Sequence, residues 1–301
     1  MSRDLHHTRA RMIWSAVVGA VFLGACSDST TLPSDTTSAV QQDALDMGAA
    51  SADETELAID ALNSADDAVA MSLSSTRTNG NLLAIRRPLC ATVSATTDTD
   101  GDGIRDNTSF TYALPACSFT NWRGGNVELT GVISISDPDP APSFAYLLGY
   151  DNFKWQYTAP NAVDSWSATR NGSRTLTATQ SQLSLTNQVS IVRTFAHRAD
   201  ATVSHNTLLV FTPDAGTTLV RGQPLPSGSA VKSGQVTFSR NGNVHAFSVN
   251  TVTPLRFDAS CNVAPRISAG EIHYELSDGS YVKVLWSACG VPAVRTWVPV
   301  S

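Results

Sequence analysis

From Leu82 to the C-terminus, short segments with apolar residues at every second position alternate with turn-forming stretches, about a dozen segments in all. The clearest sets are Val127, Leu129, Ile133 and Ile135 in one segment and Phe153, Trp155 and Tyr157 in another. A period of two is that of a β-strand, and without helical crossovers consecutive strands pair antiparallel. The sequence therefore predicts an all-β domain over residues 80–301, arranged as a large antiparallel meander, sandwich or barrel.

Pairs of Asn-Gly and Asp-Gly mark the expected hairpin turns, because both dipeptides favour type I′ geometry. Asn171-Gly172 is expected to join strands over residues 165–170 and 173–179. Asn241-Gly242 and Asp278-Gly279 are expected to close two similar hairpins near the end of the chain. Residues 294–300 contain Pro299, which lacks a backbone donor and therefore suits an edge strand.

One short helical segment is expected before this domain, over residues 51–79. Ser51 and Glu54 have the spacing of a capping box, in which Glu54 would return to the Ser51 amide. Apolar residues then recur at intervals of three and four: Ala58, Leu62, Ala65, Val69 and Leu73. Such a helix either packs on its own domain or serves as a docking surface for a partner.

Residues 1–25 have the organisation of a secretory signal peptide, with Arg3, Arg9 and Arg11 preceding an apolar run over residues 13–23. This run is too short to cross a bilayer, which takes about 20 residues of helix. It ends in Leu23-Gly24-Ala25-Cys26, which resembles the lipobox of bacterial lipoproteins.

The lipobox resemblance implies cleavage before Cys26, a diacylglycerol on its thiol and acylation of the new amino group. Ser27 follows the cysteine instead of Asp, which by analogy with the family favours the outer membrane over the inner one. Residues 26–50, which begin with many Ser, Thr and Asp residues, are then expected to be the lipidated cysteine and a flexible tether. The alternative is an ordinary signal peptide in which Cys26 is incidental.

Charge and cysteine content narrow the class of protein further. Removing residues 1–25 leaves 17 basic and 25 acidic residues, a net charge of −8 that argues against nucleic acid as a partner. Four cysteines then remain besides Cys26, and an even number in an oxidising compartment indicates two disulfides. Three connectivities are open, and the nearest-neighbour one pairs Cys90 with Cys117 and Cys261 with Cys289.

The stretch from Asp98 to Asp106 is the clearest candidate ion site. Carboxylates at loop positions 1, 3, 5 and 9, glycine at 6 and a backbone carbonyl at 7 match a calcium loop; the residues are Asp98, Asp100, Asp102, Asp106, Gly103 and Ile104. The stretch resembles the DxDxDG loops of thrombospondin type 3 repeats and EF-hand-like modules. It departs from them at position 12, where Ser109 replaces the bidentate glutamate, so a weak structural Ca²⁺ site at a hairpin tip is expected.

No catalytic motif of the common hydrolase, metalloprotease or nucleotide-binding types is present, so binding is favoured over enzyme activity. Residues 254–290 are similar to the cysteine-bearing terminal hairpins of uncharacterised β-rich envelope lipoproteins, a family that brings no known activity. His245 and His273 lie in the two similar hairpins and could approach one another across the sheet.

Two non-enzymatic functions remain open. The first is a membrane-anchored envelope or surface lipoprotein with a structural or protein-interaction role. The alternative is a carbohydrate-binding module, suggested by Trp155 and Tyr157 and also by Trp122 and Trp166, because sugars stack on exposed aromatic rings. The expected partners are thus the membrane, through the lipid, and an envelope protein or polysaccharide.

Overall fold

The computed structural model describes residues 39–63, 90–100, 105–120, 125–138, 144–160, 165–220, 224–263 and 265–300. The described part of the chain contains one helix and thirteen strands. They are α1 (Ala39–Asn63), β1 (Thr92–Ala95), β2 (Asn107–Tyr112), β3 (Ser118–Thr120), β4 (Asn126–Ser136), β5 (Phe144–Thr158), β6 (Trp166–Ala178), β7 (Leu183–Phe195), β8 (Ala201–Pro213), β9 (Gly228–Arg240), β10 (Asn243–Phe257), β11 (Ile267–Glu275), β12 (Tyr281–Trp286) and β13 (Val294–Val298).

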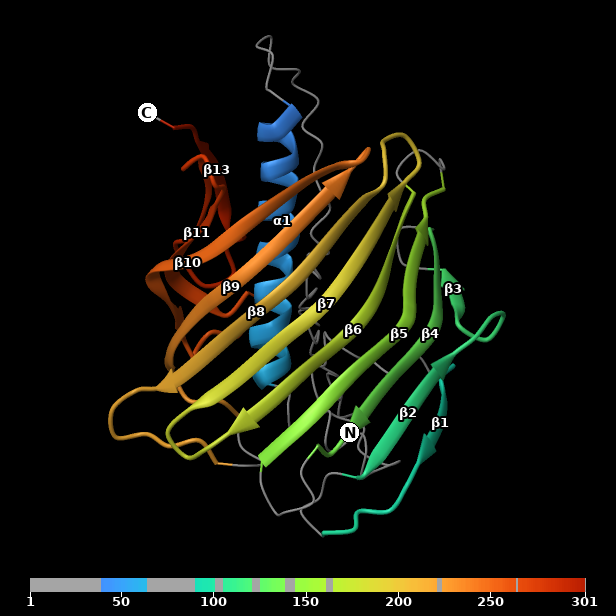
Figure 1. Ribbon diagram of the computed structural model, residues 1–301. Coiled ribbons are helices and arrows are strands. Elements are labelled where there is room, and N and C mark those ends of the chain that lie inside the picture. Colours follow the sequence, from blue (N-terminus) through green and yellow to red (C-terminus); the bar gives the residue numbers. More distant parts are fainter. Residues whose placement is uncertain are drawn as a thin grey trace, which may run out of the picture. The chain divides into compact units, whose positions relative to one another are not determined.

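All thirteen strands belong to one antiparallel sheet, which confirms the all-β prediction. The strand order is β1-β2-β4-β5-β6-β7-β8-β9-β10-β11-β12-β13, and β3 pairs with β4 beside this path. Neighbours in the sheet are thus almost always neighbours in the chain, as Figure 1 shows for the long strands β4 to β9. Of the three arrangements expected, the chain adopts the meander, in which β1 and β13 are the two ends of the strand order.

Alternation along the strands divides the sheet into an inner face and an outer face. The inner face, on which α1 packs, carries buried apolar side chains such as Leu185, Val203, Val236, Phe247 and Tyr274. On strands β7 to β9 the outward positions carry mainly hydroxyl and amide groups. Burial of apolar area gains roughly 25 cal/mol per Å², so the face rich in Val, Leu and Phe becomes the core.

Helix α1 begins at Ala39, twelve residues before the expected start at Ser51, so residues 39–50 are not part of a flexible tether. The capping-box prediction is wrong: Ser51 lies inside the helix and is fully buried, and Glu54 points at the sheet. Residues 39–50 are rich in Ala, Gln, Leu and Met, which are strong helix formers. The expected continuation of the helix to residue 79 lies outside the described residues.

The helix packs on its own domain, which was one of the two arrangements expected for it. Ala44, Met47, Ser51, Thr55 and Ala58 recur at intervals of three and four and are all buried. Its backbone lies beside β9, β12 and β13. No helix in the described part of the chain combines the length and the apolarity needed to cross a bilayer.

The expected hairpin at Asn171-Gly172 is also wrong, because β6 continues through this dipeptide. Gly172 has φ +114°, and a Cβ at this position would lie 2.1 Å from the Gln188 carbonyl oxygen. The neighbouring strand has a register irregularity between Tyr150 and Phe153, and the Asn152 amide donates a 2.8 Å hydrogen bond to Asn171 Oδ1. The Asn-Gly pair therefore accommodates a β-bulge and not a turn.

The remaining turn and edge predictions are confirmed. Asn241-Gly242 joins β9 to β10, and Asp278-Gly279 lies in the turn between β11 and β12. Strand β13 pairs with β12 and is the last strand in the order, as expected for a segment followed by Pro299.

Candidate functional site at the helix–sheet interface

Glu54 is the centre of a buried polar cluster between α1 and the sheet. Its carboxylate accepts hydrogen bonds from Arg174 on β6, from Arg170 Nη2 at 3.1 Å and from Asn187 Nδ2 at 3.2 Å. Glu54 is 1% exposed, and the side chain of Arg174 is 4% exposed. Arg174 and Asn187 are directly opposite one another on β6 and β7, so the sheet register itself assembles the recess for this carboxylate.

The charges of this cluster stabilise one another. Burial opposes ionisation of Glu54, but the guanidinium groups of Arg174 and Arg170 hold the pKa of its carboxyl well below its usual value. Burial likewise opposes the charged form of Arg174, yet Glu54 raises the pKa of the Arg174 guanidinium. Glu54 is therefore a permanently ionised anchor with its oxygens occupied by cations, an arrangement poorly suited to proton transfer at neutral pH.

Thr55, the residue after Glu54 in α1, and Lys232 on β9 belong to the same cluster. Lys232 is 3% exposed, and its Nζ donates to Thr55 Oγ1 at 2.8 Å and to the Tyr274 hydroxyl at 3.3 Å. The Tyr274 ring also lies 5.7 Å from this ammonium nitrogen. Thr55 in turn donates to the Ser51 carbonyl oxygen. Its hydroxyl therefore accepts from the buried lysine and donates to the backbone of α1.

His205 on β8 completes the cluster and is 3% exposed. Burial, with the nearby charge of Lys232, lowers the pKa of the His205 imidazole to about 3, so the ring is neutral at physiological pH. Neither ring nitrogen has a hydrogen-bond partner among the described residues, and Asn187 Oδ1 and Arg174 Nε are also unpaired there. Buried polar atoms without partners are rare in folded proteins and call for a physical explanation.

Further polar contacts hold α1 on the sheet outside this cluster. Arg240 at the end of β9 donates to Asp43 at 2.9 Å and to Asp46 at 2.5 Å, and His245 Nε2 lies 3.6 Å from Asp43. Trp286 is 1% exposed, and its indole N–H donates to Glu56 at 2.9 Å. Ionic and polar contacts thus hold the helix at points along its length, in addition to its apolar face.

The sequence pattern contained a signal for this cluster that was missed. Arg174 and Lys232 lie two residues from the buried Leu176 and Ala230 and thus on the same face of their strands, so a basic residue stands where an apolar one is expected. Glu54 was recognised, but as a helix cap. Its actual partners lie 116 to 133 residues away along the chain, and only tertiary structure can bring them together.

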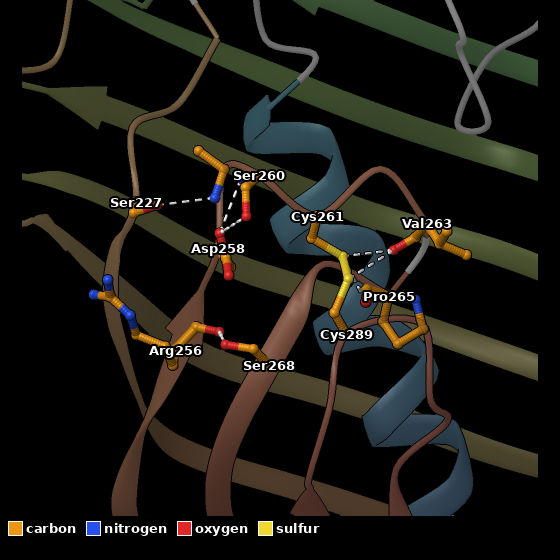
Figure 2. Close-up of a disulfide and its surroundings, with 10 residues drawn as sticks. Ser227, Arg256, Asp258, Ser260, Cys261, Val263, Pro265, Ser268 and Cys289 are labelled. Carbon is orange, nitrogen blue, oxygen red and sulfur yellow. Dashed lines mark hydrogen bonds between the residues drawn. A yellow bond between two sulfur atoms is a disulfide. The ribbon is translucent and has the colours of Figure 1, made fainter.

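The two expected disulfides are confirmed, and of the three connectivities left open the structure has the nearest-neighbour one. Cys90 pairs with Cys117, and Cys261 pairs with Cys289. Figure 2 shows the second bridge linking the loop after β10 to the segment after β12. In the same loop, the Asp258 carboxylate accepts from the Ser260 amide at 2.9 Å and from its hydroxyl at 2.6 Å.

The predicted calcium loop lies in the β1–β2 hairpin, near whose base Cys90 is bridged to Cys117. Asp98, Asp100 and Asp106 are described, whereas Asp102 and Ile104 lie outside the described residues. Asp106 accepts hydrogen bonds from the Thr99 hydroxyl at 2.7 Å and the Thr99 amide at 3.0 Å, and these lower the pKa of its carboxyl. The described residues contain no group of three His, Cys, Asp or Glu side chains placed to hold a metal ion.

The aromatic candidates Trp155 and Tyr157 lie on the inner face. Trp155 is opposite Ala168, which is opposite Arg193, and Arg193 reaches Asp53 of α1 at 3.5 Å. Trp155 and Trp166 are nevertheless each 37% exposed, with ring centroids 6.3 Å apart. Tyr157 lies 6.3 Å from the Trp166 ring, so the three rings form an aromatic patch of partly accessible side chains.

The two histidines of the similar hairpins do not meet. His273 pairs with Asn250, five residues along β10 from His245. His245 approaches Asp43 of α1, whereas His273 stacks on Tyr281 at 4.2 Å and contacts Glu271. Cys26 and Trp122 lie outside the described residues, so the proposed lipidation remains a prediction.

Comparison with known proteins gives no family for this chain. No protein-family model, curated protein or solved structure matches it at a significant level.

Proposed function

We propose that the protein is a lipid-anchored bacterial envelope protein, attached through Cys26, whose β domain has a structural or protein-interaction role without catalysis. The observation that carries this proposal is the occupation of the inner face by the chain's own helix, through Glu54, Lys232 and Arg240. A sheet whose inner face is used in this way has its outer face and edges left for partners. The buried charges also disfavour the inner face under α1 as a site for a lipid chain, since burying unpaired charge is costly.

The outer face of β7 to β9 supports a role in protein contact. Its outward positions carry no charged side chain and are mostly Ser, Thr, Asn and Gln. Among them Leu208 is 38% exposed and Val231 is 46% exposed, on the adjacent strands β8 and β9. Depletion of charge around exposed apolar side chains is typical of the centre of a protein–protein interface.

Site-specific photo-crosslinking in intact cells tests this role. A photoreactive amino acid at Leu208 or Val231 should capture a discrete partner, whereas the same residue at Thr217, in the exposed loop after β8, should not. Capture from all three positions alike, or from none, would contradict an interface on the outer face.

The proposed anchor is tested separately by metabolic labelling with a fatty acid. The wild-type chain should incorporate the label and fractionate with the outer membrane, and Cys26→Ala should do neither. A labelled Cys26→Ala variant would exclude this cysteine as the attachment site.

A carbohydrate-binding role is the second candidate, favoured by the aromatic patch of Trp155, Tyr157 and Trp166. Rings that are partly exposed and close together are suited to stack on sugars. Binding of the full-length protein in detergent to a panel of envelope polysaccharides tests this role, with calcium and then with chelator. Binding that survives in Trp155→Ala and Trp166→Ala would count against the aromatic patch.

A further inference from the structure

The cluster beneath α1 carries more positive than negative charge. Its fully buried charged members are one anion, Glu54, and two cations, Arg174 and Lys232, and Arg170 at 22% exposure adds a third cation at the margin. Glu54 is bonded to the two arginines, and no carboxylate among the described residues lies within ion-pair distance of Lys232 Nζ. An unpaired buried cation carries a desolvation cost of several kcal/mol.

Hydrogen-bond donors in the same place are also incompletely used. Lys232 has three N–H donors but only two acceptors among the described residues, Thr55 Oγ1 and the Tyr274 hydroxyl. Arg174 Nε–H and the N–H of the neutral His205 ring have no acceptor among the described residues. Ser51, which is fully buried, makes only a 3.4 Å contact with the Met47 sulfur, a weak acceptor.

These groups belong to one small region of the interface. Thr207 lies directly opposite Asn187, with His205 two positions before it on the same face of β8. The charges of Lys232 and Glu54 both act on His205, which places the imidazole within electrostatic reach of each. His205 is therefore diagonal to Asn187, a relation that keeps two side chains within reach on one face of a sheet. Lys232 reaches the same part of the interface through Thr55, the residue that follows Glu54 in α1.

We propose that the protein binds a small monovalent anion, of the size of chloride, beneath α1 and between Lys232, His205 and Arg174. One negative charge neutralises the excess positive charge of the fully buried groups. The anion also accepts hydrogen bonds from the free N–H groups of all three residues. The small size follows from the burial of the residues that would surround it. This site is independent of the proposed envelope role and of the calcium loop.

Thermal unfolding of the full-length protein in detergent provides the first test. Sodium chloride replaces sodium gluconate at constant ionic strength, so that general screening is unchanged. For a dissociation constant on the order of 1–10 mM, about 100 mM chloride should raise the Tm by roughly 3–8 °C, and the rise should saturate. A Tm that is the same in the two anions would overturn the proposal.

Two variants locate the effect. Lys232→Met retains the length of the side chain without its charge and should lose the chloride-dependent rise. Lys283→Met, at a lysine on the outer face that binds Glu271 at 3.0 Å, should retain it in full. An equal chloride effect in both variants would place the anion elsewhere and refute the assigned site.

Crystallography with bromide gives a test that does not depend on the variants' folding. Wild-type crystals grown in bromide should show an anomalous peak within contact distance of Lys232 Nζ. Ordered water alone at this position, without an anomalous signal, would overturn the proposal.

Discussion

Glu54 and Asp214 are both carboxylates paired with arginine, and the difference between them is burial. Glu54 is 1% exposed, whereas Asp214 and its partner Arg256 are 42% and 41% exposed. An exposed pair is screened by water and contributes little. Removing one member of a buried pair instead leaves the other as an uncompensated charge in a medium of low dielectric constant.

The substitution Glu54→Gln should therefore lower the free energy of unfolding by about 3–5 kcal/mol, because Arg174 loses its counter-charge. Chemical denaturation of the purified protein measures this change as a shift of the midpoint. Asp214→Asn is the matched control and should leave the midpoint nearly unchanged. Equal midpoints for the two variants would show that the buried pair does not stabilise the fold.

His205 makes the stability depend on pH. The unfolded imidazole takes up a proton below pH 6.5, whereas burial lowers the pKa in the folded state to about 3. The unfolded chain thus binds more protons between these values, so stability falls as the pH is lowered through this window.

From pH 7 to pH 5, His205 should reduce the free energy of unfolding by about 2 kcal/mol. Denaturation curves in gluconate at the two pH values measure the loss, and His205→Gln should lack that part of it. His197→Gln, at an exposed histidine, serves as the control and should behave like the wild type. If His205→Gln loses as much stability on acidification as the wild type, the histidine does not contribute.

At the scale of elements, α1 packs closely against β12 because Gly48 has no side chain. A Cβ at Gly48 would lie 2.7 Å from Val282 Cγ1. Alanine favours a helix over glycine by about 1 kcal/mol, but a clash in a packed interface costs about 1–3 kcal/mol. The steric term is expected to exceed the gain in helix propensity.

Gly48→Ala should therefore destabilise the protein, and the loss should be smaller in a Val282→Ala background, where the clashing methyl groups are absent. A double-mutant cycle of denaturation midpoints measures this coupling. Additive effects of the two substitutions would mean that α1 does not rest on β12 through Gly48.

The β1–β2 hairpin carries the calcium prediction. A chelator should lower the Tm of the wild-type protein, because an ion held by the carboxylates from Asp98 to Asp106 would stabilise the loop. Asp98→Asn should abolish this response, and Asp278→Asn, in the turn between β11 and β12, should preserve it. An unchanged melt, with calcium and magnesium indistinguishable, would refute a calcium site.

In the molecule as a whole, strands that are neighbours in the sheet are almost always neighbours in the chain. The two disulfides also join cysteines that are close in sequence, near the two ends of the strand order. The Cys261–Cys289 bridge spans 28 residues and encloses β11 and β12. Such a bridge restricts the unfolded chain more than the folded one.

Replacing both cysteines, Cys261→Ser with Cys289→Ser, should cost about 3–4 kcal/mol of stability in the chain-entropy model. Denaturation of the double variant against the oxidised wild type measures the loss. Amide exchange should also accelerate first in β11 to β13 if this bridge restrains the final strands. Unchanged exchange there would argue that the sheet holds these strands without it.

The local features of this protein could be predicted from its amino-acid sequence. A period of two predicts strands wherever one face is buried, and Asn241-Gly242 and Asp278-Gly279 predict turns. These features depend on interactions between residues near one another in sequence. They can therefore be predicted before the three-dimensional structure is known.

The partners of the helix and the role of Asn171-Gly172 depend instead on long-range contacts. Glu54 matches a helix cap locally, but pairing with Arg174 from β6 outweighs a cap worth about 1 kcal/mol. The Asn-Gly pair satisfies the local rule for a turn, yet the ladders with β5 and β7 continue through it. In both cases many long-range contacts, made together, exceed one short-range preference, and for that reason the buried charged cluster could not be predicted from sequence.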